Sequence, residues 1–248
     1  MGIPIAVQLY TLRDETKKDF RSVLEKVARI GYAGVEFAGF GDVPARVMRR
    51  FLQDNGLKAV GNHTAKELIA DRLDEAVEYN LEIGSRYIVC PWDKYDTYEE
   101  WIEAAKWYDE TGAIIRGKGL KLCYHNHAHE FQAYNGRLAI EILAEDTGPD
   151  NLKFEPDTYW IRHAGLDPAE HIIKYGDRCP LIHIKDMGPD DKDTVEIGEG
   201  IMDIKAIIEA SRMIGAEWLI VEQDNCKRPS LESVELSHMN LSNILYRR

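Results

Sequence analysis

The 248-residue sequence lacks the features that mark several broad classes of protein. No uninterrupted apolar stretch approaches the roughly 20 residues needed to cross a bilayer, and the N-terminus has no basic region followed by a long apolar core. The four cysteines form no Cys-x-x-Cys pair, which argues against a zinc ribbon and a disulfide scaffold. We therefore expect a cytoplasmic protein with reduced thiols and no membrane partner.

Positive charge is also scarce. The chain has 31 Lys and Arg against 43 Asp and Glu, a net charge of −12, which opposes the counterion release that drives nucleic-acid binding. Few Lys or Arg residues lie at the ends of the apolar runs, where Lys185 is the clearest, and no Gly-rich loop that could bind phosphate is evident. The composition therefore predicts no nucleic-acid partner and does not favour a phosphorylated ligand.

A unit of apolar run, polar loop and amphipathic stretch recurs about eight times along the chain. No Pro-rich or Gly/Ser-rich linker divides the repeat, and no Gly-x-Gly-x-x-Gly follows the first run, which disfavours an open doubly wound sheet. The pattern predicts a (β/α)8 TIM barrel as a single domain over residues 1–248, with a last helix near 230–246. The expected strands are 3–9, 33–37, 57–60, 87–90, 120–124, 152–154, 181–184 and 218–221.

Carboxylates and imidazoles follow the last four predicted strands. The cluster from Cys123 to Phe131 has three histidines and Glu130, and Asp157, His183 and Glu222 stand at the ends of the next three strands. Such side chains meet at the carboxyl end of a barrel, where converging carboxylates repel one another unless a cation neutralises them. A divalent metal is the simplest explanation, and helix caps or rim salt bridges are the alternative.

Several short motifs follow one another along the chain. They are Gln8-Leu9-Tyr10, Gly31-Tyr32-Ala33-Gly34-Val35-Glu36, Tyr124-His125-Asn126-His127, Asp157-Thr158-Tyr159-Trp160, His183-Ile184-Lys185-Asp186, Gly198-Glu199-Gly200 and Val221-Glu222-Gln223-Asp224. Taken together, their order and spacing resemble the xylose isomerase-like TIM barrel superfamily, and within it the sugar phosphate isomerase/epimerase and inosose dehydratase group. The resemblance implies one divalent metal, with Asp157, His183 and Glu222 as ligands by position.

The fourth ligand is where the sequence departs from the family pattern. Many relatives have a glutamate at the position of His125, and in the epimerases that glutamate is also one of two acid/base groups. We expect Glu130 to replace it as a ligand because an oxygen-rich site favours carboxylates, with His125 as the competing ligand. Mn²⁺ or Mg²⁺ is the expected metal, with Zn²⁺ or Co²⁺ as alternatives.

The resemblance implies a metal-dependent sugar isomerase or epimerase that acts through an enediolate on a ketose or keto-sugar, with Glu222, Lys185 and His127 as catalytic residues. The missing strand-five glutamate keeps a dehydratase or lyase of inosose or 3-keto-glycoside type as the second hypothesis. A non-catalytic sugar-binding barrel is the alternative of a different class. An apurinic-site endonuclease is least favoured, because the chain is acidic and offers ligands for a single metal.

Further residues after the strands are candidates for binding the sugar. Glu36, His63 and Trp92 follow the second, third and fourth predicted strands, and His125 and Asn126 lie on the fifth. A rim salt bridge for Glu36 or His63, or a hydrophobic plug for Trp92, is an equally simple reading. The aromatic residues between Tyr95 and Tyr108 are compatible with a homo-oligomer.

Overall fold

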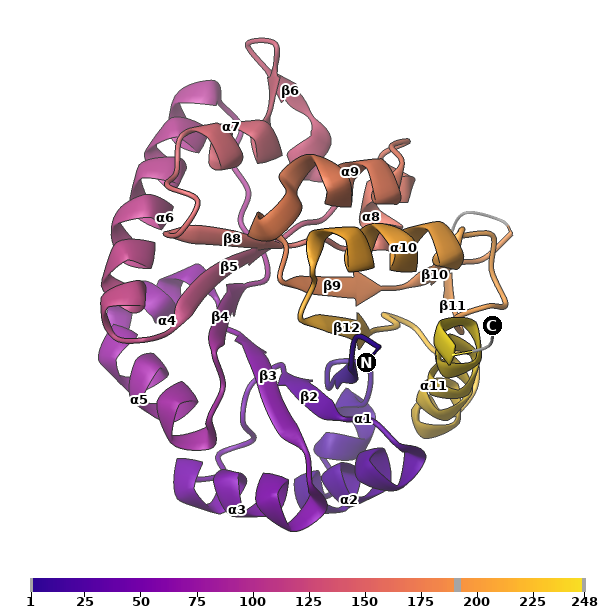
Figure 1. Ribbon diagram of the computed structural model, residues 1–248. Helices are drawn as coiled ribbons and strands as arrows, with labels where there is room; N and C mark the ends of the chain where they lie inside the picture. The colour runs from indigo at the N-terminus through magenta and orange to yellow at the C-terminus, as the bar shows by residue number, and fades with distance from the viewer. Residues whose placement is uncertain (1, 190–192, 247–248) are drawn as a thin grey trace.

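The computed structural model describes residues 2–189 and 193–246, and it has a ring of eight parallel strands inside a layer of helices (Figure 1). The hydrogen-bonded order is β8-β5-β4-β3-β2-β1-β12-β9. This arrangement confirms the predicted (β/α)8 barrel, whereas the single domain over residues 1–248 stays a prediction. The ring strands are β1 (Ile5–Gln8), β2 (Gly34–Phe37), β3 (Lys58–His63), β4 (Tyr87–Cys90), β5 (Lys121–His125), β8 (Leu152–Glu155), β9 (Leu181–Ile184) and β12 (Trp218–Val221).

The helices form the outer layer, where amphipathic faces cover the ring. A glycine in the left-handed conformation ends several of them, for example Gly56 (φ 66°) after α3 and Gly215 (φ 72°) after α10. The helices are α1 (Arg13–Thr16), α2 (Phe20–Ile30), α3 (Ala45–Asn55), α4 (Lys66–Asp71), α5 (Leu73–Ile83), α6 (Tyr98–Gly117), α7 (Ala139–Glu145), α8 (Thr158–His163), α9 (Pro168–Tyr175), α10 (Ile204–Ile214) and α11 (Ser230–Tyr246), with 3₁₀ turns at His129–Phe131 and Gly176–Arg178.

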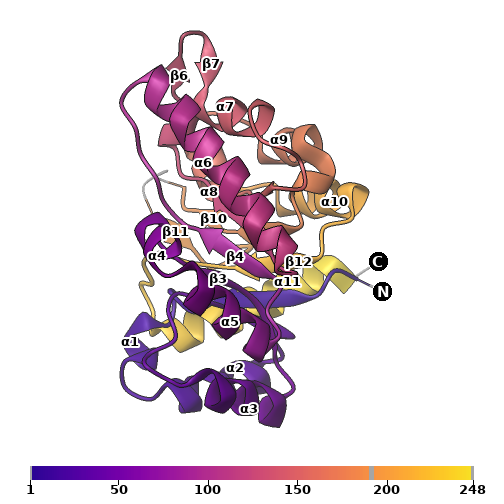
Figure 2. The same cartoon turned by 90° about the vertical axis from the view of Figure 1, so that its left-hand side faces the viewer.

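Two short hairpins extend the ring at its carboxyl end and were not predicted. The first pairs β6 (Ala133–Tyr134) with β7 (Arg137–Leu138), and the second pairs β10 (Asp186–Met187) with β11 (Thr194–Val195). Figure 2 shows the first hairpin at one extremity of the molecule and the two chain ends close together on another side. Gly2 lies against the ring of Tyr246 there.

Side chains on the ring strands alternate between two environments. Leu122, Ile182 and Leu219 belong to the large core shared with the helices, whereas Cys123, Leu181 and Ile220 belong to a small apolar cluster with members from several strands. Because successive side chains of a strand point to opposite faces, the residues two positions after that inner cluster also point inward. These include His125, His183 and Glu222, so the polar residues lie above an apolar plug.

Ring closure is uneven. The first and last ring strands in the sequence, β1 and β12, are paired over three residues, whereas β8 and β9 meet through the isolated bridge Asp157↔His183. The His183 amide donates to the Pro156 carbonyl at 3.0 Å, and the Thr158 hydroxyl donates to the His183 carbonyl at 2.9 Å. We call this β8/β9 contact the seam.

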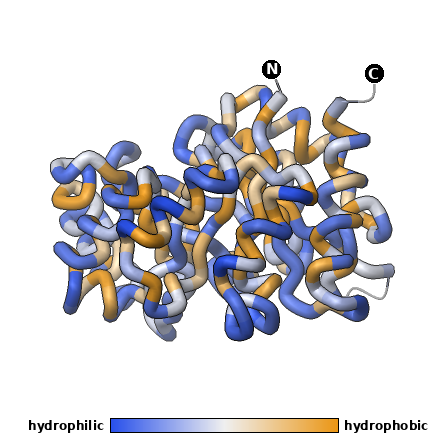
Figure 3. The backbone as a smooth tube through the Cα atoms, turned by 90° about the horizontal axis from the view of Figure 1, so that it is seen from below, coloured by the Kyte–Doolittle hydropathy of each residue, from blue (hydrophilic) through white to orange (hydrophobic). Residues whose placement is uncertain are grey.

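Hydrophobic and hydrophilic stretches alternate over short lengths along the described backbone (Figure 3). Within residues 2–189 and 193–246, none of the helices combines the length and the apolar character that crossing a membrane requires.

Candidate active site

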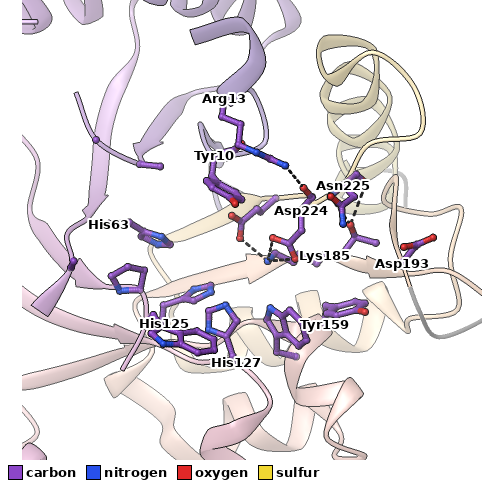
Figure 4. A pocket seen from close by; sticks show the side chains of 18 of the residues that line it. Tyr10, Arg13, His63, His125, His127, Tyr159, Lys185, Asp193, Asp224 and Asn225 are labelled. Carbon is purple, nitrogen blue, oxygen red and sulfur yellow. Dashed lines mark hydrogen bonds and ion pairs between the residues drawn. The ribbon is translucent and has the colours of Figure 1, made fainter. Parts of the chain in front are cut away.

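A cavity of about 830 Å³ opens at the carboxyl ends of the strands. Its wall includes most of the residues predicted to bind or transform a substrate: His63, Trp92, His125, His127, Lys185 and Glu222. In Figure 4, Tyr10 and Arg13 lie above Lys185 in the view, and His127 and Tyr159 lie below it. The position agrees with the general rule that barrel enzymes build their sites from the loops at this end.

Four buried side chains at the floor of the cavity form a potential metal site. His125, Asp157, His183 and Glu222 each offer one ligand atom, and these atoms all lie within 4.8 Å of one another. His125 Nε2 is 3.5 Å from Asp157 Oδ2, and His183 Nδ1 is 2.9 Å from Glu222 Oε2. We call these four residues the floor group.

Asp157 supplies the clearest sign that the floor group fits a cation. Its Oδ1 accepts the amide hydrogens of Tyr159 and Trp160, at 3.0 and 3.1 Å, and so caps α8. Its Oδ2 is buried and accepts no hydrogen bond among the described residues, although Lys185 Nζ lies 2.9 Å away. Burial raises the pKa of the carboxyl group, and the charge of Lys185 opposes that shift. A buried, incompletely paired carboxylate oxygen suits a metal ion.

A second layer of carboxylates lies beneath the floor group and holds its imidazoles. Glu36 Oε2 is 2.6 Å from His183 Nε2, and Glu155 Oε2 is 3.1 Å from His125 Nδ1. Gln8 Nε2 donates to Glu36 Oε2 at 2.9 Å. Each histidine of the floor group thus has one ring nitrogen toward the cavity floor and the other on a carboxylate, the arrangement that fixes the orientation of metal-binding imidazoles.

His63 joins these two lower carboxylates. Its Nε2 lies 2.9 Å from Glu155 Oε2 and 3.3 Å from Glu36 Oε2. Burial disfavours the charged form of His63, but the charge of Glu36 and the hydrogen bonds to both carboxylates outweigh it and raise its pKa to about 9. With His125, Glu155 and His183, His63 forms a second four-residue group of similar spacing. Both groups share His125 and His183, and each has two members in the cavity wall. The floor group is the one that adds Glu222 and Asp157, with its incompletely paired Oδ2.

Lys185 is a buried cation within the same site. Its Nζ lies 2.8 Å from Glu222 Oε2, 2.9 Å from Asp157 Oδ2 and 3.0 Å from Asp224 Oδ1. Burial favours the neutral amine, but the three carboxylates outweigh it and hold the pKa of Lys185 well above its ordinary value. Burial raises the pKa of Glu222, but the charge of Lys185 and the hydrogen bond and charge of His183 outweigh it and hold that pKa well below its ordinary value. An ammonium and a carboxylate therefore stand side by side at neutral pH.

His127 is neutral at the cavity wall. Burial and the charge of Lys185 lower its pKa to about 3. Its Nδ1 is buried and has no hydrogen-bond partner among the described residues. His127 lines the cavity, where a neutral imidazole can form a hydrogen bond with a substrate hydroxyl.

Three predicted site residues belong neither to the cavity wall nor to the floor group. Glu130 belongs to neither four-residue group in the described chain, since its carboxylate accepts the Tyr124 hydroxyl at 2.7 Å and the His127 amide at 2.8 Å. Asn126 accepts the Asp157 amide at 3.0 Å, and Glu36 lies in the second layer. The structure thus brings His125, rather than Glu130, together with the other three predicted ligands, and gives Asn126 and Glu36 supporting positions.

Some site residues had no assigned role in the sequence. Glu155 and Asp224 lie two positions from Asp157 and Glu222, so the period of two along a strand could have placed them on the same inward face. Tyr10, Arg13 and Leu68 line the cavity from segments that carry no periodic signal.

The loop after β9 is held by one buried carboxylate. Asp186 accepts the amide hydrogens of Met187 and Gly198 at 2.8 Å, and of Gly200 and Met202 at 3.1 Å. A Cβ atom at Gly200 would stand 2.2 Å from Asp186 Oδ1, so a glycine is needed there. The loop supplies Asp193 and Thr194 to the cavity wall.

Fold and site together define a (β/α)8 barrel with a buried imidazole and carboxylate group at the carboxyl ends of its strands. A family model described as xylose isomerase-like TIM barrel matches residues 24–239. The chain belongs to that family, as the motifs indicated.

The similar proteins are named for two kinds of activity, dehydration and isomerisation or epimerisation. The chain is 27% identical over 194 residues to an inosose dehydratase of Geobacillus kaustophilus (strain HTA426), which covers 68% of this chain and 62% of that protein, less than two thirds of its length. It matches a sugar phosphate isomerase/epimerase structure from Parabacteroides distasonis with a TM-score of 0.86 at 25% identity, covering 99% of this chain and 96% of the other. The structure of an IolI protein with a bound zinc atom matches with a TM-score of 0.77 at 16% identity, covering 98% of each chain, which shows the shared fold.

Proposed function

We propose that the protein is a divalent-metal-dependent enzyme that abstracts a proton next to the carbonyl of a small polyhydroxylated substrate. The observation that carries the proposal is the floor group, with its incompletely paired Asp157 Oδ2 beneath the cavity. The inosose dehydratase and the sugar phosphate isomerase/epimerase among the similar proteins support a sugar or keto-sugar as substrate.

His125, Asp157, His183 and Glu222 would hold the metal. When bound there, it supplies a Lewis acid that polarises a carbonyl or hydroxyl oxygen and so acidifies the neighbouring C–H. Two imidazoles beside two carboxylates are a softer donor set than the oxygen-rich site expected from the sequence, so Mn²⁺, Zn²⁺ or Co²⁺ fits better than Mg²⁺.

The chain's own residues divide the proton transfers. Glu222 is ionised and lies in the cavity wall, so it can accept the proton from carbon. Lys185 is protonated beside it and can give a proton to a departing oxygen. His127 is neutral and lies in the cavity wall, so its imidazole can hold a substrate hydroxyl in place.

Elimination is the outcome that this arrangement supports best, which makes the protein a dehydratase or lyase of the inosose or 3-keto-glycoside type. Its acid and base stand on one side of the cavity, and strand five presents His125 where a two-glutamate epimerase has a facing carboxylate. Isomerisation by one shuttling base is the second candidate, favoured by the similarity to the sugar phosphate isomerase/epimerase.

The test uses a panel of ketoses, inososes and keto-glycosides in D₂O with Mn²⁺-loaded protein. Elimination predicts loss of water or an aglycone, and isomerisation predicts deuterium at carbon without loss of an oxygen substituent. The Asp157→Asn variant should lose both metal and reaction, whereas Glu199→Gln, an exposed carboxylate paired with Arg228, should keep both. No exchange and no elimination with any substrate would contradict the proposal and favour a non-catalytic sugar-binding barrel. Cleavage of abasic DNA instead would favour an endonuclease.

A further inference from the structure

The cavity wall is divided into two chemically different halves. The half that follows β9 and β12 is rich in ionisable and polar side chains, with Lys185, Glu222 and Asp224 among them. The half that follows β1 to β4 is mainly apolar. Its apolar members are Tyr10, Ala38, Ala65, Leu68, Pro91 and Trp92.

Three large side chains of the apolar half stay exposed although the chain has a core to bury them. Trp92 and Leu68 are each 51% exposed, and Tyr10 is 43% exposed. Burying such a side chain is typically worth about 1.5–3 kcal/mol, so a cluster left open at a cavity is a candidate for burial by a ligand. Leu68 reaches the cavity from α4, a short helix between β3 and α5.

An aromatic row borders this surface. The ring of Trp92 is 4.7 Å from that of His127, which is 5.3 Å from the ring of Trp160. Tyr10 lies in the wall as well, with the guanidinium of Arg13 4.3 Å from its ring centroid. Flat apolar groups pack well against such rings.

Hydrogen-bonding capacity in the apolar half is limited. Arg13 already donates to the Tyr10 carbonyl at 2.9 Å and to the Asp224 carbonyl at 2.8 Å. His63 Nε2 faces Glu155 and Glu36 below the cavity. Tyr10, Arg13 and His63 are the polar side chains of this half, so a second sugar ring placed here would find few partners for its hydroxyl groups, whereas a hydrocarbon ring needs none.

Size points the same way. The cavity of about 830 Å³ lies in the ~300–1,000 Å³ range of pockets that hold drug-sized ligands, and a single hexose is much smaller than such ligands. With a sugar ring above the floor group, space remains toward β1 to β4.

We propose that the substrate is a two-part molecule: a sugar ring that carries a flat apolar substituent, such as an aryl aglycone, seated against Trp92, Leu68 and Tyr10. The proposal rests on the proposed function for the placement of the sugar ring over the floor group, and it adds the class of the second part.

The test compares phenyl, methyl and glucosyl glycosides of one keto-sugar by calorimetric binding to the metal-loaded protein. We expect the phenyl glycoside to bind about tenfold or more tightly than the methyl glycoside. Trp92→Ala and Leu68→Ser should each reduce that ratio severalfold. Leu81→Ser, at a leucine that is 49% exposed on α5 and is not part of the described cavity wall, should keep the full ratio.

Equal binding of phenyl and methyl glycosides, tightest binding of the glucosyl glycoside, or no binding of any of the three would overturn this proposal. The same holds if both cavity variants keep the phenyl preference. These outcomes differ from failure of the proposed function. Deuterium exchange with small ketoses but no preference for the phenyl glycoside would contradict only the proposed apolar substituent. A preference for the phenyl glycoside without any reaction would contradict only the proposed reaction.

Discussion

His125 and His183 each connect two layers of the site through the two nitrogens of one ring. One nitrogen faces Asp157 or Glu222 at the cavity floor, and the other is held by Glu155 or Glu36 below. A ring nitrogen that donates its hydrogen to a carboxylate leaves the other nitrogen unprotonated and ready to bind a metal. The lower carboxylates therefore set the tautomer of the two histidines as well as their orientation.

The fourth ligand can be decided by a pair of substitutions. We predict that His125→Ala lowers Mn²⁺ affinity by about 10–100-fold or more, because it removes a member of the floor group. Glu130→Gln should leave Mn²⁺ affinity within about threefold of the original, since Glu130 is held by Tyr124 and the His127 amide. Titration calorimetry with the metal alone measures both. A large loss of Mn²⁺ affinity in the Glu130 variant and none in the His125 variant would make Glu130 the fourth ligand instead.

Glu130 also predicts a pH effect on stability. Burial raises its pKa from 4.5 to about 7. A folded state that binds this proton more tightly than the unfolded state gains stability that is complete below about pH 4.5 and is lost as pH rises through about 7. The free energy of unfolding should therefore fall between pH 5 and pH 8 in the original chain. In Glu130→Gln, denaturant unfolding at the two pH values should show a fall that is about 1–3 kcal/mol smaller. An identical difference between the two pH values in both proteins would contradict it.

At the residue level, the sequence could identify Asp157, His183 and Glu222 because each ends an apolar strand and barrel strands bring their ends together. It favoured Glu130 over His125 as the fourth ligand, whereas the structure brings His125 to the other three. That choice depends on the direction of the 3₁₀ turn His129–Phe131, where the Tyr124 hydroxyl and the His127 amide capture the carboxylate. Both partners are tertiary or local contacts that carry no periodic signal.

Among the elements, the loop after β9 depends most on a single side chain. Asp186 accepts hydrogen bonds from four backbone amides, that of Met187 beside it and those of Gly198, Gly200 and Met202 further along the chain. The motif Gly198-Glu199-Gly200 is explained by this contact, because the backbone must approach the carboxylate closely, and Glu199 itself pairs with Arg228 at 3.0 Å.

We predict that Asp186→Ala destabilises the protein by about 2–4 kcal/mol, because it leaves four backbone amides without their shared acceptor. Urea unfolding followed by circular dichroism measures the change. Glu199→Ala in the same loop, which loses only an exposed ion pair, should change stability by less than about 0.5 kcal/mol. Similar effects of the two substitutions would show that Asp186 does not hold the loop.

The eight ring strands were predictable from sequence, whereas β6, β7, β10 and β11 were not. The ring strands are short apolar runs separated by amphipathic helices, a pattern that repeats and so can be recognised. Each hairpin strand has two residues, too few for any period to appear. The short helix α4 lacks a side-chain cap as well, so its role in bringing Leu68 to the cavity required the structure.

On the scale of the whole molecule, the floor group spans the weakest contact of the ring. Asp157 follows β8 and His183 belongs to β9, and their isolated bridge is the seam. The repeat pattern predicted that the ring closes, but it gave no information on which pair of neighbouring strands has the weakest contact. Strand pairing depends on backbone register, which is set by the packing of the complete barrel.

Metal binding should therefore strengthen the seam. At about 100 times its dissociation constant, Mn²⁺ should stabilise the folded chain by about 2.7 kcal/mol and raise the Tm by roughly 5–10 °C. Hydrogen exchange of the His183 amide, which donates to Pro156 across the seam, should slow more than that of Leu219, which donates to Pro4. Asp157→Asn should abolish both effects. Uniform slowing of all ring amides would argue against a local role of the metal.

The alternation of inward and outward side chains also limits how such a site can change by descent. A substitution at an inward position alters one group of the site, and its neighbours keep their places. A one-residue insertion within β5 or β9 moves every later side chain of that strand to the opposite face, which would take His125 or His183 toward the helices. We therefore expect insertions and deletions of single residues to be tolerated in the loops and hairpins, so that relatives differ in length there rather than within the ring strands.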